Sequence, residues 1–126
     1  MKNPIGWFEI YVDNLSRAKI FYETVFQVEL TEFSNPNINE TIQMKHFPFE
    51  MQAYGATGAL VKMDGVSAGA GGTIIYFSSD DCAIEAARIE NAGGTIQQAK
   101  TSIGEHGFIV LARDTESNIF GIHSMQ

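Results

Sequence analysis

The sequence has little that would support binding to nucleic acid or insertion into a membrane. Only 8 lysine and arginine residues stand against 15 acidic ones, which gives a formal net charge of −7. Nucleic acid is bound by clustered basic side chains, so this balance argues against such a partner. No apolar run approaches the ~20 residues that cross a bilayer, and the N-terminus lacks the apolar core of a signal peptide. We therefore expect a cytoplasmic protein with neither a nucleic-acid nor a membrane partner.

The chain also lacks the means to form a disulfide or a phosphate-binding loop. Its one cysteine, Cys82, excludes an intrachain disulfide, which fits a reducing compartment. The glycine-rich stretch Gly69–Gly72 precedes a predicted strand, whereas a loop that cradles phosphate precedes a helix. What remains is an ordinary globular composition, 44% hydrophobic and 18% charged, at a length typical of one domain. We expect a single domain over residues 1–126.

The stretch Gly6–Phe26, GWFEIYVDNLSRAKIFYETVF, predicts one strand that runs directly into one helix. In its first part Trp7, Glu9 and Tyr11 alternate with the apolar Phe8, Ile10 and Val12, which is the period of a strand with two different faces. Its second part spaces apolar residues by three and four, which is typical of a helix with one buried face. Asn14 lies between the two parts, where its side chain can cap the helix. A strand that looks buried and yet carries an acid, Glu9, is the first indication of a site.

The second half of the chain repeats this order. Sliding it onto the first half places Asp81 on Asn14 and Tyr76 on Glu9. Each half then reads as a strand, a helix and three further strands, which indicates a duplication. The helix of the second half follows Asp81 and ends at Gly93–Gly94. The predicted strands besides the first are Val28–Phe33, Thr41–Phe47, Gly58–Met63, Thr73–Phe77, Thr95–Gln98, Phe108–Arg113 and Asn118–Ser124. We expect a turn at Asn35–Asn39, and a loop or a further strand at Glu50–Tyr54.

Three stretches resemble the vicinal oxygen chelate superfamily, which includes glyoxalase I, the bleomycin-resistance proteins and the extradiol dioxygenases. They are YVDNLSRAKIFYETVF in the first half, and FSSDDCAIEAARIENAGG and DTESNIFGIHS in the second. The resemblance implies an α+β fold of two paired βαβββ modules, whose curled mixed sheets surround a cavity. Module one would span residues 1–63 and module two residues 73–126, with a glycine-rich connector at 64–72.

The resemblance also implies where a metal would bind. Metal-dependent members carry His, Gln or Glu on the first strand of each module and Glu on the last strand. The matching positions here hold Trp7, Ile74 (or Thr73, with a one-residue shift) and Gly121, and Met51–Met63 contains neither a carboxylate nor a histidine. A catalytic zinc needs about three protein ligands. We therefore predict no metal ligands and no cofactor, with a divalent metal as the alternative.

Two residues are candidates for proton transfer. If Trp7 faces the cavity, Glu9 does too, because the residues are two apart on one strand, and burial would suit its carboxylate to act as a base. His123 lies two residues beyond Gly121 and would share its face. The competing interpretations are a solvent-facing Glu9, with Trp7 at a dimer surface, and an ordinary hydrogen-bonded histidine near the chain end.

Candidate ligand-binding residues surround these two. The predicted set, aromatic or polar and expected on the cavity faces or a covering loop, is Trp7, Tyr11, Gln52, Tyr76 and His106. Such surfaces suit an apolar or planar molecule. The leading hypothesis is a homodimeric protein that binds a small organic molecule, or a divergent enzyme with a degenerate metal site. The alternative is a metal-dependent lyase or dioxygenase that uses Glu9, His123 and Gln52 as shifted ligands. A dimeric interaction module without a ligand is the third interpretation.

Overall fold

The computed structural model describes residues 3–32 and 42–126. In these ranges the first sheet has the strand order β1 (Phe8–Tyr11), β4 (Gly58–Met63), β3 (Ile42–His46) and β2 (Thr31–Glu32). The second sheet has the order β5 (Ile75–Ser78), β8 (Ile119–Ser124), β7 (Phe108–Arg113) and β6 (Thr95–Ser102). β1 pairs with β4, and β5 with β8, in parallel, while the other pairs are antiparallel. The predicted α+β fold of two βαβββ units with mixed sheets is confirmed, and both sheets are open.

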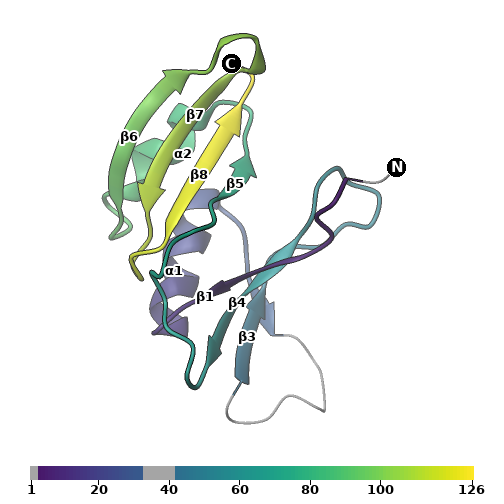
Figure 1. Cartoon of the computed structure of the whole chain (residues 1–126), viewed down its shortest axis with the longest axis vertical. Helices are drawn as coiled ribbons and strands as arrows, with labels where there is room; N and C mark the ends of the chain where they lie inside the picture. Colours follow the sequence, from purple (N-terminus) through teal and green to yellow (C-terminus); the bar gives the residue numbers. More distant parts are fainter. Residues whose placement is uncertain (1–2, 33–41) are drawn as a thin grey trace.

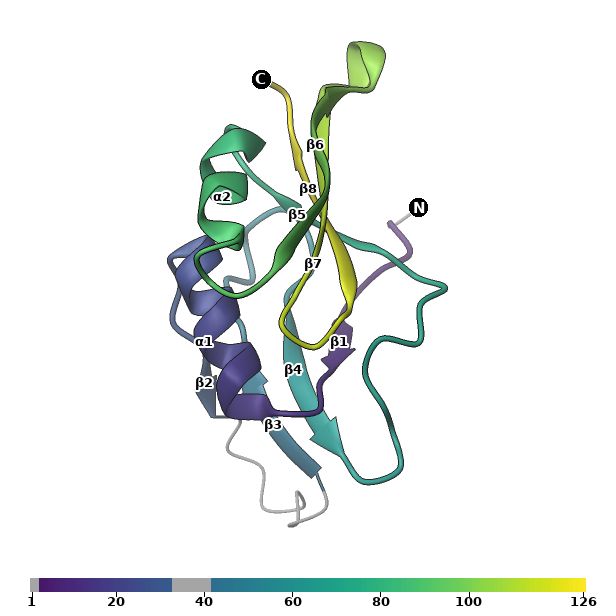
Figure 2. The same ribbon diagram turned by 90° about the vertical axis from the view of Figure 1, so that its left-hand side faces the viewer.

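One helix follows the first strand of each unit, as the repeat predicts. α1 (Leu15–Phe26) begins after Asn14, whose side chain accepts from the amide of Arg17 at 3.0 Å. α2 (Cys82–Ile89) begins after Asp81, whose side chain accepts from the amide of Ala83 at 3.0 Å. Both helices lie on one side of the two sheets, while the connector between β4 and β5 lies on the other (Figures 1 and 2). A short 3-10 turn, η1 (Gly104–His106), precedes β7. Within the described ranges no helix is long and apolar enough to cross a membrane.

Several predicted element boundaries differ from the observed ones. β2 covers two of the residues predicted between Val28 and Phe33, since Val28 and Leu30 pack on the core without pairing, and Phe33 lies outside the described residues. β6 extends four residues beyond Gln98, through an irregular register with β7. Its side chains are nearly all exposed, so no hydrophobic alternation marks it in the sequence. The stretch 50–54 forms a loop of turns and bends, whereas the predicted turn at 35–39 also lies outside the described residues.

A buried hydrophobic cluster joins the two units. The apolar faces of α1 and α2 pack on the sheets, and the cluster contains residues of both units. Tyr22 and Phe120 lie at its centre with ring centroids 5.7 Å apart, and Phe8 of β1 meets Phe77 of β5 edge to face at 6.1 Å. Full burial of one such aromatic side chain contributes about 1.5–3 kcal/mol. The shared core fixes the two sheets relative to each other, and with them the crevice between β1 and β5.

Candidate functional site

A hollow of about 200 Å3 lies where the two units meet. Its lining residues come from β1, from Tyr22 of α1, from the connector and from the first residues of β5 and β8. The connector bows away from the sheets (Figure 2). The residues that line it are Glu9, Ile10, Tyr11, Tyr22, Ser67, Gly69, Ala70, Gly71, Thr73, Ile75, Asn118, Ile119 and Phe120. The wall is mostly apolar or made of small residues, and a few polar groups lie among them. Such a composition is typical of sites for small organic molecules.

Glu9 is the centre of a hydrogen-bonded cluster on β1 and the residues before it. The hydroxyl of Tyr11 donates to one carboxylate oxygen at 2.7 Å, and the indole nitrogen of Trp7 donates to the other at 3.2 Å. The three residues therefore share the face of the strand opposite Ile10, which is buried in the core. The hydrogen bond to Glu9, together with partial burial, raises the pKa of the Tyr11 phenol. Glu9 and Tyr11 also line the hollow, so the cluster lies at its edge.

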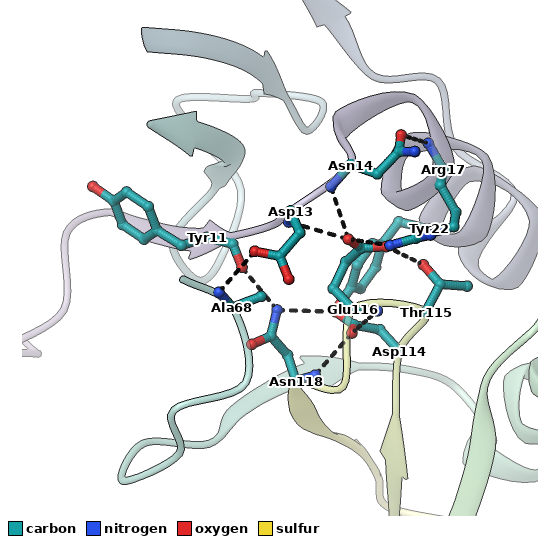
Figure 3. A network of polar contacts seen from close by, with 10 residues as sticks. All are labelled: Tyr11, Asp13, Asn14, Arg17, Tyr22, Ala68, Asp114, Thr115, Glu116 and Asn118. Carbon is teal, nitrogen blue, oxygen red and sulfur yellow. Dashed lines mark hydrogen bonds and ion pairs between the residues drawn. The ribbon is translucent and has the colours of Figure 1, made fainter. Parts of the chain in front are cut away.

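Glu116, in the turn between β7 and β8, fixes the junction between β1 and α1 (Figure 3). Its side chain is fully buried, and one oxygen accepts from the backbone amides of Asp13 and Asn14 at 3.1 and 2.9 Å. The Arg17 guanidinium donates to both oxygens, at 2.7 and 2.9 Å. Burial alone would raise the pKa of Glu116, but these donors, Arg17 first among them, outweigh it and hold the pKa below its usual value.

Two further residues of this turn extend the network to the hollow. Asp114 accepts from the hydroxyl of the buried Tyr22 at 2.7 Å and from the amides of Glu116 and Asn118. Burial nevertheless raises the pKa of the Asp114 carboxyl above its usual value. Asn118 donates to the Tyr11 carbonyl at 2.9 Å and accepts from the Gly69 amide at 2.7 Å. The turn thereby ties β1 and the connector, two walls of the hollow, to each other, while the Tyr11 ring points away from the network (Figure 3).

The positions that the resemblance assigns to a metal do not hold a fitting set of ligands. Trp7 and Ile74 have no ligand atom suited to a divalent ion. The β4 residues that pair with β1 have no such atom in their side chains either. At Gly121 a β-carbon would overlap the Tyr76 ring, which lies over this glycine. A glutamate at 121 therefore needs Tyr76 to move. Among the residues that the structure describes, no three His, Cys, Asp or Glu side chains lie close enough together to hold an ion.

The other predicted site residues, on β5, β8, η1 and the loop before β4, are not among the residues that line the hollow. His123, on β8, has its Nε2 2.7 Å from the carbonyl oxygen of His106, which makes Nε2 the donor. His106 itself is exposed in η1. Gln52 is exposed in the loop before β4, and no hydrogen bond joins it or His123 to Glu9 in the described part of the chain. A joint role for Glu9 and His123 in proton transfer stays a prediction.

The sequence interpretation missed the residues that hold the site together. Residues 114–117 fall between two predicted strands and 64–72 form the predicted connector, and neither stretch is among the predicted site residues, whereas both contribute to the hollow or its supports. An available signal was the density of Asp, Glu and Asn in DTESN, because such side chains accept or donate to nearby backbone in turns. That signal marks a turn, but it does not reveal a partner about 100 residues away, such as Arg17, at a separation of 99.

Residues 4–121 match the Glyoxalase/Bleomycin resistance protein/Dioxygenase superfamily. The chain belongs to this superfamily, as its two βαβββ units and the predicted resemblance indicated. No curated protein shows significant sequence similarity to the chain.

Solved structures of the same fold cover nearly the whole chain. A glyoxalase/bleomycin resistance protein/dioxygenase domain from Frankia sp. EAN1pec has a TM-score of 0.72 and 14% identity, with 100% of each chain covered. The antibiotic-binding protein TnmS3 from Streptomyces sp. CB03234 has a TM-score of 0.67 and 18% identity, over 99% of this chain and 98% of that one. A mutant of glyoxalase I from Zea mays has a TM-score of 0.74 and 17% identity, but the match covers 96% of this chain and 46% of the maize chain. At these identities the likeness shows the fold alone.

Proposed function

We propose that this protein binds a small apolar or aromatic organic molecule in the hollow beside Glu9. The observation that carries the proposal is the cluster of Trp7, Glu9 and Tyr11 at the edge of a hollow with a largely apolar wall. The aromatic side chains offer contact area, and the carboxylate offers a polar group that orients a ligand. A hollow of about 200 Å3 suits a molecule of roughly one or two rings.

A binding protein, or a divergent enzyme without a metal, fits these residues better than a metal-dependent lyase or dioxygenase. The positions that the resemblance assigns to a metal offer no set of ligands, and Tyr76 occupies the space above Gly121. Catalysis by Glu9 as a base would need a ligand with an acidic proton next to its carboxylate. Binding alone needs no such feature, so it is the simpler proposal.

Trp7 fluorescence provides the test, because Trp7 is the only tryptophan and its indole contacts Glu9. We expect small aromatic compounds to change this fluorescence in a saturable way, and Trp7→Phe to retain their binding in calorimetry with reduced affinity.

A second measurement is the metal content of protein purified without chelators. Stoichiometric nickel, zinc or iron would favour the metal-dependent alternative. No response of Trp7 or of the calorimeter to any compound would favour an interaction module.

We further propose a cytoplasmic homodimer. Tyr76 of β5 is 46% exposed and Ile74, directly before β5, is 41% exposed, and exposed apolar surface of this kind is often covered by a partner. Sedimentation velocity should give twice the mass of the chain, and Tyr76→Ser should weaken the association. A monomer at all concentrations would contradict the dimer without affecting the binding proposal. Fractionation of expressing cells tests the compartment.

A further inference from the structure

Among the described residues that line the hollow, Glu9 alone carries a formal charge. All the other residues that line it are uncharged at neutral pH, being aromatic, aliphatic, small, hydroxyl-bearing or amide side chains. A ligand in this hollow therefore meets a single negative charge and meets no positive one among its described lining residues. A binding site with this charge distribution disfavours anions and favours cations, since the Coulomb energy at contact is several times larger here than in bulk water.

In the part of the chain that the structure describes, no basic side chain forms an ion pair with the Glu9 carboxylate. Its two hydrogen-bond donors, the Tyr11 hydroxyl and the Trp7 indole, are neutral. Other carboxylates of the described residues do have basic partners: Glu116 pairs with Arg17, Glu23 with Lys19 and Asp81 with Lys100, whereas no ion pair there involves Glu9. The net charge of −7 adds no compensation from a distance. Glu9 is thus a negative charge held in place by aromatic neighbours.

The carboxylate retains the capacity to accept further hydrogen bonds. An ionised carboxylate offers about four acceptor positions, and the Tyr11 hydroxyl and the Trp7 indole nitrogen each take one. The donors also hold two electron-rich rings near the charge, and tryptophan is the side chain that attracts cations most strongly through its ring face. A carboxylate flanked by aromatic rings is the combination of groups that recognises ammonium ions.

We propose that the ligand of this hollow carries a positively charged nitrogen, which contacts the Glu9 carboxylate and the rings of Trp7 and Tyr11. This inference rests on the proposed function and names the chemical class of the molecule: an aromatic or apolar amine, protonated at neutral pH, or a quaternary ammonium compound.

The test compares three probes of similar size: benzylammonium, benzyl alcohol and benzoate, each titrated by calorimetry at neutral pH and low ionic strength. We expect benzylammonium to bind about tenfold more tightly than benzyl alcohol, and benzoate to bind most weakly. Glu9→Gln should remove the preference for benzylammonium over benzyl alcohol. Glu90→Gln, which removes one charge from an exposed residue at the end of α2, is the matched control and should keep the preference. Salt should reduce the preference, since the Debye length is about 10 Å at 0.1 M.

The outcomes separate this inference from the proposed function. If benzyl alcohol and benzylammonium bind equally well, or benzoate binds best, the hollow is a binding site but the inference is wrong. If Glu9→Gln and Glu90→Gln reduce the preference equally, the net charge of the protein causes it and Glu9 does not, which also overturns the inference. If none of the three probes binds, the inference and the proposed function fail together.

Discussion

The two sheets carry similar side chains on the face that packs against the helices and different side chains on the other face. On the inner side, Ile10 of β1 pairs with Leu60 of β4, and the equivalent pair in the second sheet is Phe77 with Ile122. All four are apolar, and all belong to the core or pack against it. On the outer side, Glu9 pairs with Ala59, whereas Tyr76 pairs with Gly121 and its ring lies over that glycine.

The two units carry similar side chains only on the faces that form their shared core. A change on the inner face must preserve volume, because interiors are close-packed. The outer faces are free of this constraint, and there the first sheet has a carboxylate with aromatic neighbours while the second has a ring. We attribute the difference to the proposed binding, in which the ligand in the hollow contacts the outer face of the first sheet at Glu9.

The largest expected effect comes from breaking the link between the units. Glu116→Ala removes the acceptor of two amides and of the Arg17 guanidinium, and we expect it to lower the free energy of unfolding by about 3 kcal/mol. Urea unfolding at neutral pH measures this, with Glu90→Ala as the exposed control. The pKa of Glu116 is lowered in the folded protein, so its contribution is present above the usual glutamate pKa and is lost as the pH falls through the folded value. The difference in free energy of unfolding between wild type and variant should therefore be smaller at acid pH than at neutral pH. An equal difference at acid and neutral pH would contradict this account.

A smaller effect is expected where the outer faces differ. Gly121→Ala should destabilise the protein by about 2 kcal/mol, because the new β-carbon overlaps the Tyr76 ring. In a Tyr76→Ala background the same change should cost much less, and the difference between the two values measures the coupling. Equal costs in both backgrounds would mean that Tyr76 does not fill the space over Gly121.

The smallest effect concerns the two helices. Tyr22 of α1 and Ile89 of α2 occupy equivalent positions and are both fully buried, but only Tyr22 carries a hydroxyl, which donates to Asp114. Tyr22→Phe should lower stability by about 1 kcal/mol at neutral pH, while Tyr54→Phe, at an exposed site, should change nothing.

The pH dependence of this variant has a defined sign. Burial raises the folded pKa of Asp114, so the favourable contribution of this carboxyl is present below its unfolded pKa and is lost as the pH rises through the folded value. Loss of the Tyr22 donor should raise that pKa further, because the ionised form loses a hydrogen bond. Tyr22→Phe should therefore be more destabilising at neutral than at acid pH. The reverse order would exclude a hydrogen bond from Tyr22 to the ionised Asp114 carboxylate.

The fold could be predicted from the sequence because two local signals agreed with the repeat. Alternation marked β1, and the caps Asn14 and Asp81 marked both helix starts. The length of β6 could not be predicted, since its exposed side chains show no period. That strand is extended by its pairing with β7, which depends on the tertiary structure and not on a local sequence pattern.

The site was predictable only within one strand. Period two places Trp7, Glu9 and Tyr11 on one face, and their hydrogen bonds agree with that register. The turn residues Asp114 and Glu116 were not recognised, because their partners lie about 100 residues away and no local pattern encodes such a distance. Contacts of this kind depend on how the two units dock.

Chemical-shift mapping with benzylammonium on isotope-labelled protein tests the central claim, the placement of the binding site at the first sheet, most directly. The account predicts that the largest shift changes fall on the Trp7 indole, on the amides of Glu9 and Tyr11, and on the connector residues that line the hollow. Shift changes centred on Tyr76, Gly121 and His123 would contradict it, because the ligand would then bind the outer face of the second sheet.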